Sequence, residues 1–347
     1  MQLILSSFLA IGMMPMAWMK IASPPVSLGF SAVAVTAANP NGHILQVNGD
    51  ARLERQERQL QPLPGLPIYP GDRLLAAQGA KLVVQCADLT IESILGEQLN
   101  GCAAPPSSSL VFSPPPSSPC NPDLYECPPR GDWASGASND GIPYPISPRR
   151  TYLLNDRPPL NWNRVSGATE YTVSLLEDGI ELWQVTTSQT QLDYPNERPL
   201  RVGADYLLVI ETDTGISSLA AEPIPGGLGF RLLSEDSRRE VEGAIAQIDT
   251  QNLEESARSL AIAFLYAERR LTADAIEILE KLIASGLENA PLYSRVAQLY
   301  WHYLALPEQA LELYCQTVKL AGDDLLELRQ QAQEHLDRFT DSCESLP

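Results

Sequence analysis

The hydrophobic period of this 347-residue chain changes near residue 234, and this change constrains the fold most strongly. Before it, short runs alternate apolar and polar residues, as in residues 44–54 and 81–91. Such alternation is typical of strands. After it, apolar residues recur at i, i+3 and i+4, which is typical of amphipathic helices. The length allows two or three domains. We therefore expect a multidomain protein, all-β in its first part and all-α at the C-terminus.

Prolines divide the β part of the chain in two. Many of the 29 prolines cluster, and residues 103–148 consist largely of Pro, Ser, Gly and Asn. A segment of this composition buries too little apolar surface to offset the entropy lost on ordering. We expect a linker over residues 103–148. The alternative is a ligand for a proline-recognising domain, which is a less common use of such a composition.

The first residues have the character of an export signal. Residues 2–18 carry no charge, and a run of small residues follows at 31–38. This pattern predicts a signal peptide over residues 1–37, with cleavage after Ala37. No basic residue precedes the apolar run, but a translation start at Met19 would place Lys20 in the basic region. A retained membrane anchor is the alternative, although prolines interrupt the apolar stretch.

Cysteine spacing also favours export to the periplasm, the medium or the cell surface. The six cysteines form three local pairs, which are Cys86 with Cys102, Cys120 with Cys127, and Cys315 with Cys343. An even number of cysteines in an exported chain suggests disulfides, although spacing alone does not fix their pairing. A zinc site would require closely spaced pairs such as C-x-x-C, which this sequence lacks, so we expect no metal.

The segment over residues 41–102 carries a family resemblance. A strand containing Gly49, a turn with Pro70-Gly71-Asp72, and a strand ending in Cys86-Ala-Asp-Leu-Thr together resemble the FecR-type periplasmic domain. The resemblance implies a small β domain. It also implies a role in envelope sensing, because well-known members pass signals from outer-membrane receptors to anti-sigma factors. The Asp-Gly hairpin usual in that family is replaced here by Cys86-Ala-Asp.

Residues 149–233 contain several short runs rich in aromatic and β-branched residues, separated by turn formers. Strands at this spacing favour a sandwich. The phrase Pro-x-Leu-x-Trp-x-x-Val-x-Gly-Ala-x-x-Tyr-x-Val, followed by residues 200–206, resembles a fibronectin type III-like domain. The resemblance implies that Trp162 lies in the core and that Tyr206 is the tyrosine near the corner of an end strand.

Residues 234–347 carry an internal repeat. Ile262 and Tyr266 of one stretch align with Ala297 and Trp301 of another, a shift of 35 residues. A repeat of this length is the mark of a helical repeat protein, and these residues resemble tetratricopeptide (TPR) repeats. TPR-like arrays expose a concave face, on which aromatic residues are candidate anchors for a protein partner. These candidates are Tyr293, Tyr300, Trp301 and Tyr303. The alternative is that they pack between the helices.

The sequence offers no recognisable catalytic constellation. His43, His302 and His335 lack partner motifs, and we expect them to be packed or surface side chains. The glycine-rich run at 226–229 lacks the Lys-Ser/Thr of a phosphate loop. The pair Asp323-Asp324 precedes a helical run, where acidic residues serve as capping residues. We therefore expect no enzyme activity and no cofactor.

These observations lead to one functional hypothesis and two alternatives. A net charge of −19 disfavours nucleic acid as a partner. We expect a non-catalytic exported scaffold that mediates protein-protein interaction in the bacterial envelope through TPR-like repeats. Membrane contact would come only from an uncleaved N-terminal segment. The first alternative is FecR-like sensing, although no span of suitable length follows residue 40. The second is glycan or peptidoglycan binding by Trp162 or Trp183, although strand alternation favours a core position for both.

Overall fold

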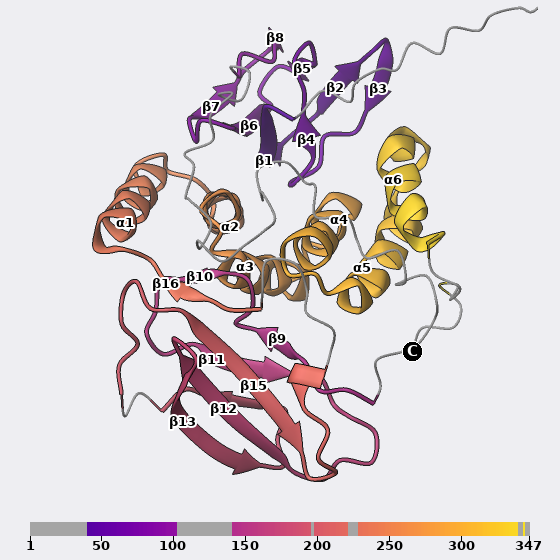
Figure 1. Ribbon diagram of the computed structural model, residues 1–347. Coiled ribbons are helices and arrows are strands. Elements are labelled where there is room, and N and C mark those ends of the chain that lie inside the picture. The colour runs from indigo at the N-terminus through magenta and orange to yellow at the C-terminus, as the bar shows by residue number, and fades with distance from the viewer. Residues whose placement is uncertain (1–39, 103–140, 196–197, 221–227, 339–342, 344–347) are drawn as a thin grey trace, which may run out of the picture. The chain divides into compact units, whose positions relative to one another are not determined.

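The computed structural model places strands in the first part of the chain and helices in the last part (Figure 1). It describes residues 40–102, 141–195, 198–220, 228–338 and 343. The expected signal peptide and most of the expected linker lie outside these residues. The prediction of a mixed multidomain protein, β-rich and then helical, is confirmed at this level. No helix within the described ranges has the length and apolar character needed to cross a membrane.

Residues 40–102 form two four-stranded antiparallel sheets, and we call them the β module. The strand order of the first sheet is β4 (Pro67–Ile68), β1 (Gly42–Asn48), β6 (Lys81–Cys86) and β7 (Ile91–Ile94). The strand order of the second is β3 (Arg58–Leu60), β2 (Ala51–Arg55), β5 (Arg73–Ala76) and β8 (Glu97–Leu99).

The Pro-Gly-Asp sequence forms the turn between β4 and β5. Gly71 has a φ of 94°, a conformation that favours glycine. Asp72 is only 2% exposed, and its carboxylate accepts hydrogen bonds from the Tyr69 amide at 2.9 Å and from two nitrogens of Arg55 at 3.0 and 2.8 Å. The same guanidinium donates to the Pro67 carbonyl oxygen at 2.8 Å. The aspartate therefore ties the turn to strand β2.

Strand β6 is buried on both of its faces. Leu82 and Val84 pack into the core of the β module, whereas Val83 packs with Leu45 of β1 into a core shared with the helices. A strand covered on both faces reads as a continuous apolar run rather than an alternating one. The apolar run Leu-Val-Val at 82–84 is therefore explained by the helices, which cover the face of β6 that carries Val83.

The described residues between 141 and 233 fold as two three-stranded sheets and one small pair of strands, which we call the sandwich. The strand order of one sheet is β14 (Gln191–Asp193), β11 (Pro159–Trp162) and β9 (Pro145–Ser147). The strand order of the other is β13 (Ile180–Thr187), β12 (Tyr171–Glu177) and β15 (Tyr206–Thr212). β10 (Tyr152–Leu153) pairs in parallel with β16 (Arg231–Leu232), and a short 3-10 helix, η2 (Ser218–Ala220), follows β15.

The core of the sandwich contains Trp162, which is 2% exposed and lies edge-on to Tyr171 at 5.9 Å. The hydroxyl of Tyr206 donates to Glu177 at 2.7 Å and accepts from the Arg201 amide at 2.5 Å. It thereby fastens the segment that precedes β15.

The sandwich begins earlier than the sequence predicted. Residues 141–148 were assigned to the linker, but β9 lies among them and pairs with β11. Proline lacks the amide that a central strand requires and is tolerated on an edge strand, which is where β9 lies. Because of the prolines at 143, 145 and 148, strand β9 was predicted as part of the linker.

The C-terminal part of the chain forms antiparallel helices, which we call the helical array. They are α1 (Glu235–Asp249), α2 (Glu255–Glu268), α3 (Thr272–Ala284), α4 (Ala290–Gln298), α5 (Pro307–Leu320) and α6 (Leu326–Leu336). The π-helical segment η3 (Leu299–Tyr303) continues α4, and a 3-10 turn, η4 (Asp323–Leu325), precedes α6. The helical periodicity of the sequence is confirmed, although the segment that follows α4 is a π-helix, which is wider than an α-helix.

The helix pair α4–α5 repeats the pair α2–α3. α2 begins at residue 255 and α4 at 290, and α3 begins at 272 and α5 at 307, so each start recurs 35 residues later. The turn inside each pair also repeats, because Arg270 and Ala305 both have a positive φ, of 58° and 52°. The leucine that follows is buried in both pairs, as Leu271 and Leu306.

The prediction that Asp323 and Asp324 are capping residues is wrong, because neither side chain caps η4 or α6. Asp323 accepts a hydrogen bond from Arg329 at 2.9 Å, and Asp324 accepts one from the backbone amide of Gln61 in the β module at 3.2 Å. Side-chain caps are formed by Ser234, which precedes α1, and by Asn289, which precedes α4.

Candidate interaction surfaces

The structure places the four candidate anchors on one helix and its π-helical extension. Tyr293 belongs to α4, whereas Tyr300, Trp301 and Tyr303 belong to η3. All four side chains are partly buried.

Three of the four anchors pack against neighbouring helices. The Tyr300 hydroxyl donates to Glu280 of α3 at 2.9 Å, and burial raises the pKa of that hydroxyl. Tyr303 packs against the core that contains α2 and α3. Trp301 lies 4.8 Å from His335 of α6, measured between ring centroids. Their rings therefore serve the packing of the array, which leaves Tyr293 as the candidate best placed for an outside partner.

A cluster of rings joins η3, α5 and α6. Tyr314 is 1% exposed and stacks on His335 with ring centroids 4.6 Å apart, while Trp301 lies edge-on to Tyr314 at 6.0 Å. His302 lies 5.4 Å from His335. Burial, with a further contribution from His302, lowers the pKa of His335 to about 4, so this imidazole is neutral at neutral pH.

The face of the array formed by α2, α4 and α6 contacts the β module (Figure 1). At its centre the His43 ring stacks on Phe264 of α2, with centroids 4.1 Å apart. Burial is the main cause that lowers the pKa of His43 to about 3, and the charge of Arg295 on α4 acts in the same direction. A side chain with an ordinary pKa near 6.5 is therefore held neutral at this contact.

Polar contacts surround that centre. Asn48 donates to Glu254 at the start of α2, with a distance of 2.9 Å. Glu327 of α6 lies 3.8 Å from Arg55 and 3.9 Å from Arg58 of the β module. An apolar centre with a polar rim is the usual anatomy of an interface between folded proteins.

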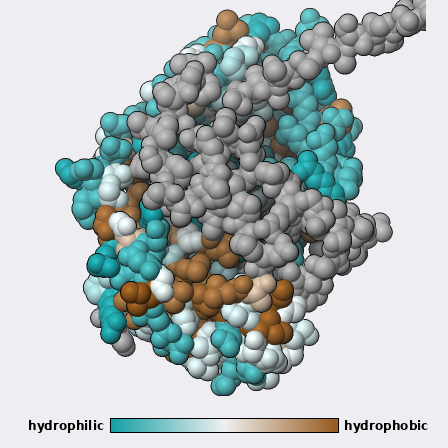
Figure 2. Space-filling view, viewed as in Figure 1, coloured by the Kyte–Doolittle hydropathy of each residue, from teal (hydrophilic) through white to brown (hydrophobic). Residues whose placement is uncertain are grey.

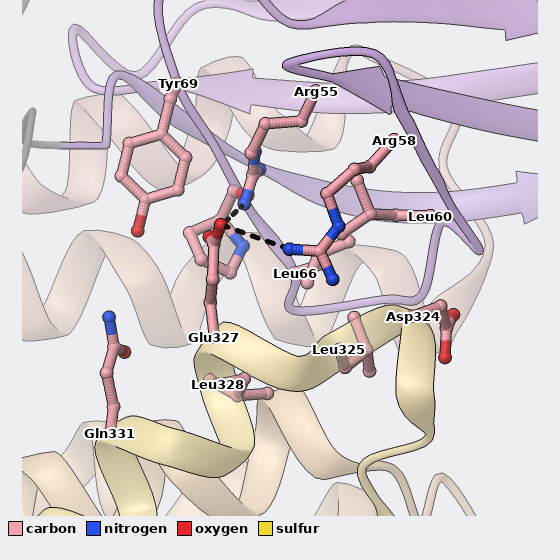
Figure 3. Close-up of a pocket in the computed structure, with 11 residues that line it drawn as sticks. Arg55, Arg58, Leu60, Leu66, Tyr69, Asp324, Leu325, Glu327, Leu328 and Gln331 are labelled. Atoms are coloured by element: carbon pink, nitrogen blue, oxygen red, sulfur yellow. Dashed lines mark hydrogen bonds and ion pairs between the residues drawn. The ribbon is translucent and has the colours of Figure 1, made fainter.

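A small hollow lies in this contact, between the β module and the start of α6 (Figure 3). In Figure 3 Glu327 points from α6 toward Arg55 and Arg58, while Tyr69 and Gln331 lie to one side. Arg55 also lies over the ring of Tyr69, 4.4 Å from its centroid. The two arginines of the hollow are balanced by the carboxylates of Asp324 and Glu327. This balance is typical of a contact between two packed parts rather than of a binding site for a charged ligand.

The sandwich contacts the turns inside the two helix pairs. Its Tyr152 amide donates to the carbonyl oxygen of Arg270 at 3.0 Å, and the Ala273 amide donates to the Thr151 hydroxyl at 3.3 Å. In the second pair, the Arg149 guanidinium donates to the carbonyl oxygens of Leu304 and Ala305. Arg270 and Ala305 are equivalent positions of the repeat, so the sandwich contacts the equivalent turn of each helix pair.

Arg149 is the most buried cation of that contact. It is 3% exposed, and its two short hydrogen bonds measure 2.7 and 3.2 Å. Burial, and then the neighbouring Arg150, lower its pKa to about 9, which leaves it charged at neutral pH. The carbonyl oxygens at a helix C-terminus carry partial negative charge, which stabilises a cation there.

Two of the expected cysteine pairs are disulfides in the structure. Cys86 bonds to Cys102 with Cα atoms 5.2 Å apart, and Cys315 bonds to Cys343 with Cα atoms 5.6 Å apart. The first closes the β module on itself, and the second ties the end of the chain to α5. The pair Cys120 and Cys127 lies outside the described residues.

No group of three or more His, Cys, Asp or Glu residues could hold a metal ion in the part of the chain that the structure describes. Sequence reasoning missed Asp274 in the first turn of α3, whose pKa burial and then Glu277 raise to about 7. Its place in a first turn is typical of an acidic residue at a helix N-terminus, and only the folded structure shows that its side chain is partly buried.

The tryptophans proposed for glycan binding lie in or beside the sandwich core. Trp162 is buried, and Trp183 is partly buried and lies edge-on to Tyr194 at 5.7 Å. Figure 2 shows hydrophobic side chains gathered over the sandwich, in the lower half of the view. Exposed large hydrophobic residues of the sandwich are Ile180, Val202, Ile216 and Leu219.

The outer side of the sheet β13-β12-β15 carries an apolar strip. Leu175 and Leu208 are buried, so their alternating neighbours Leu176, Leu207 and Val209 face the other side of the sheet. Leu176 lies opposite Leu207, and all three of these side chains are only partly buried.

Comparison with known proteins does not extend these assignments: no family model matches the sequence, and no curated protein is similar to it. The FecR-like, fibronectin type III-like and TPR-like resemblances therefore stay predictions.

Proposed function

We propose that this chain is a non-catalytic, exported scaffold that holds protein partners in the bacterial envelope. One observation carries the proposal. The helical array, which we take to be TPR-like, contacts the β module through one face and the sandwich through its turns. These contacts hold two β surfaces in a defined relation, and holding surfaces in place is the task of a scaffold.

The disulfides support the export part of the proposal. Cys86–Cys102 and Cys315–Cys343 have the geometry of formed bonds, and such bonds persist in oxidising compartments such as the periplasm or the cell surface. A periplasmic, secreted or surface location accounts for both.

The partner surface that we favour is the apolar strip of Leu176, Leu207 and Val209, with Tyr293 as a second point of contact. Contiguous apolar side chains outside a core often mark contact sites for proteins. Three of the original four anchors are engaged within the array, so a partner that used only those rings would have to rearrange the helices. A glycan platform is less well supported, because Trp162 is 2% exposed and offers no ring face.

Capture from an envelope extract tests this proposal. The intact chain is the bait, beside a variant carrying Leu207→Ser with Val209→Ser and a matched control, Ile216→Ser, which changes an exposed apolar residue elsewhere on the sandwich. We expect a defined protein to be retained by the wild type and the control and lost from the strip variant. Retention of purified peptidoglycan, with no protein that depends on the strip, would contradict the proposal.

A further inference from the structure

The β module contacts the helical array through side chains and through the backbone amide of Gln61, which donates to the Asp324 side chain. Strands of the β module pair only with one another, and in the described parts of the chain its backbone-to-backbone hydrogen bonds all stay inside it. Cys86 and Cys102 also belong to the same module. The module can therefore leave the array without breaking a sheet or a covalent bond.

The centre of this contact is closely fitted. Leu45 and Val83 enter the core of the helices, and His43 lies flat on Phe264, with an interplanar angle of 18°. A Cβ atom added at Gly65 would lie 2.5 Å from Leu292 of α4. Matching of this kind gives an interface its specificity.

The rim of the contact is ionic and open to water. Glu327 is 52% exposed and lies between Arg55 and Arg58, at 3.8 and 3.9 Å. Ion pairs at an accessible rim fix the register of an interface and are weakened by salt. The rim therefore offers a means of adjusting the contact without altering its apolar centre.

We propose that the β module is an intramolecular ligand of the helical array. It releases and rebinds as a folded unit, and while docked it excludes other proteins from the face of α2, α4 and α6. Such release adds a regulatory step to the proposed scaffold. Only one consequence rests on the proposed function: a protein partner that binds this face would compete with the β module.

Cleavage of the folded full-length chain tests the proposal. A specific protease site inserted after Ser108 separates the β module from the rest and leaves Cys86–Cys102 and Cys315–Cys343 each within one fragment. Native mass spectrometry and size-exclusion chromatography then measure the association of the two fragments. We expect one complex at neutral pH and micromolar concentration, which separates into folded fragments on dilution or in concentrated salt.

Charge variants of the same cleavable chain sharpen the test. Glu327→Arg faces two arginines and should weaken the association by about tenfold or more, and adding Arg58→Glu should restore it. Glu334→Arg is the matched control, because this residue is exposed on the same helix and makes no contact with the β module in the described residues.

Three results would overturn the inference. They are fragments that part at once in the wild type, fragments that part only when they unfold, and a Glu327→Arg variant that behaves as Glu334→Arg does. None of them depends on finding an outside partner, so failure here and failure of the envelope capture are distinguishable.

Discussion

Asp72 and Arg55 form the most buried ion pair of the β module, with side-chain exposures of 3% and 11%. The aspartate also accepts from the Tyr69 amide, so one carboxylate fixes both a turn and a neighbouring strand. Removing one partner of a buried pair leaves the other charge uncompensated, which is far more costly than losing an exposed pair.

We expect Asp72→Asn to lower the free energy of unfolding by about 3 kcal/mol. The matched control is Glu97→Gln, which removes an exposed partner of Arg73 in the same module and should have little effect. Urea unfolding at neutral pH measures both. Equal losses in the two variants would show that burial does not set the strength of these pairs.

His43 makes the stability of the chain depend on pH. Its pKa in the folded chain is about 3, below the ordinary 6.5. Between these two pH values the imidazole is therefore protonated in the unfolded chain and neutral in the folded chain. Stability is therefore complete above pH 6.5 and is lost as the pH falls toward 3.

Between pH 7.5 and pH 5 this one histidine should remove about 2 kcal/mol of stability, given folded and unfolded pKa values near 3 and 6.5. The His43→Phe variant keeps a ring on Phe264 and does not titrate, so it should lose about 2 kcal/mol less than the wild type over the same interval. Urea unfolding at the two pH values decides the matter. Identical pH dependence in both proteins would contradict the assignment.

At the scale of elements, the repeated turn of the helix pairs is where the sandwich attaches. Arg149 donates to carbonyl oxygens of the second turn, and Thr151 and Tyr152 contact the first. The repeat therefore supplies two equivalent backbone sites, and the sandwich meets them with different residues.

Arg149→Gln should weaken this attachment, because the carbonyl oxygens of Leu304 and Ala305 lose a buried charged donor. We expect a loss of about 2 kcal/mol in the free energy of unfolding. Arg164→Gln, an exposed arginine of the same sandwich, serves as the control and should unfold as the wild type does. Urea titration followed by tryptophan fluorescence compares the two. A loss of equal size in both variants would rule out the attachment as its cause.

The disulfides tie elements that the sequence separates by 16 and 28 residues. Peptide mapping of the unreduced protein should recover Cys86 joined to Cys102, and Cys315 joined to Cys343. Free thiols at these four positions in protein taken from the envelope would contradict the pairing and weaken the case for export.

The sequence predicted most elements and few of their contacts. Helix positions followed from the apolar period, and the cysteine pairs followed from their proximity in the chain. Strand β9 was missed because prolines concealed it, and the π-helical turn of η3 was missed because its residues are equally compatible with an ordinary helix. Local patterns determine single elements, whereas a turn or an edge strand depends on its neighbours.

At the scale of the whole molecule, one core draws residues from all three parts, although the sandwich also has a core of its own. Leu45 and Val83 of the β module and Leu233 at the end of the sandwich belong to one core with the helices. His43 and Phe264 stack although more than two hundred residues separate them, and no periodicity predicts such a pair. The unbroken apolar run at 82–84 was the one available sign that a second surface covers β6. The candidate anchors lie on α4 and η3, and the packing of three of them against other helices could not be predicted from the sequence.

Calorimetry of the intact chain in concentrated salt tests the central claim, that the β module is a folded unit docked on a body formed by the sandwich and the helical array. We expect the β module to unfold in a transition of its own, separate from the transition that the sandwich and the array share. A single cooperative transition of all three parts would contradict the claim, because the β module would then unfold only together with the rest.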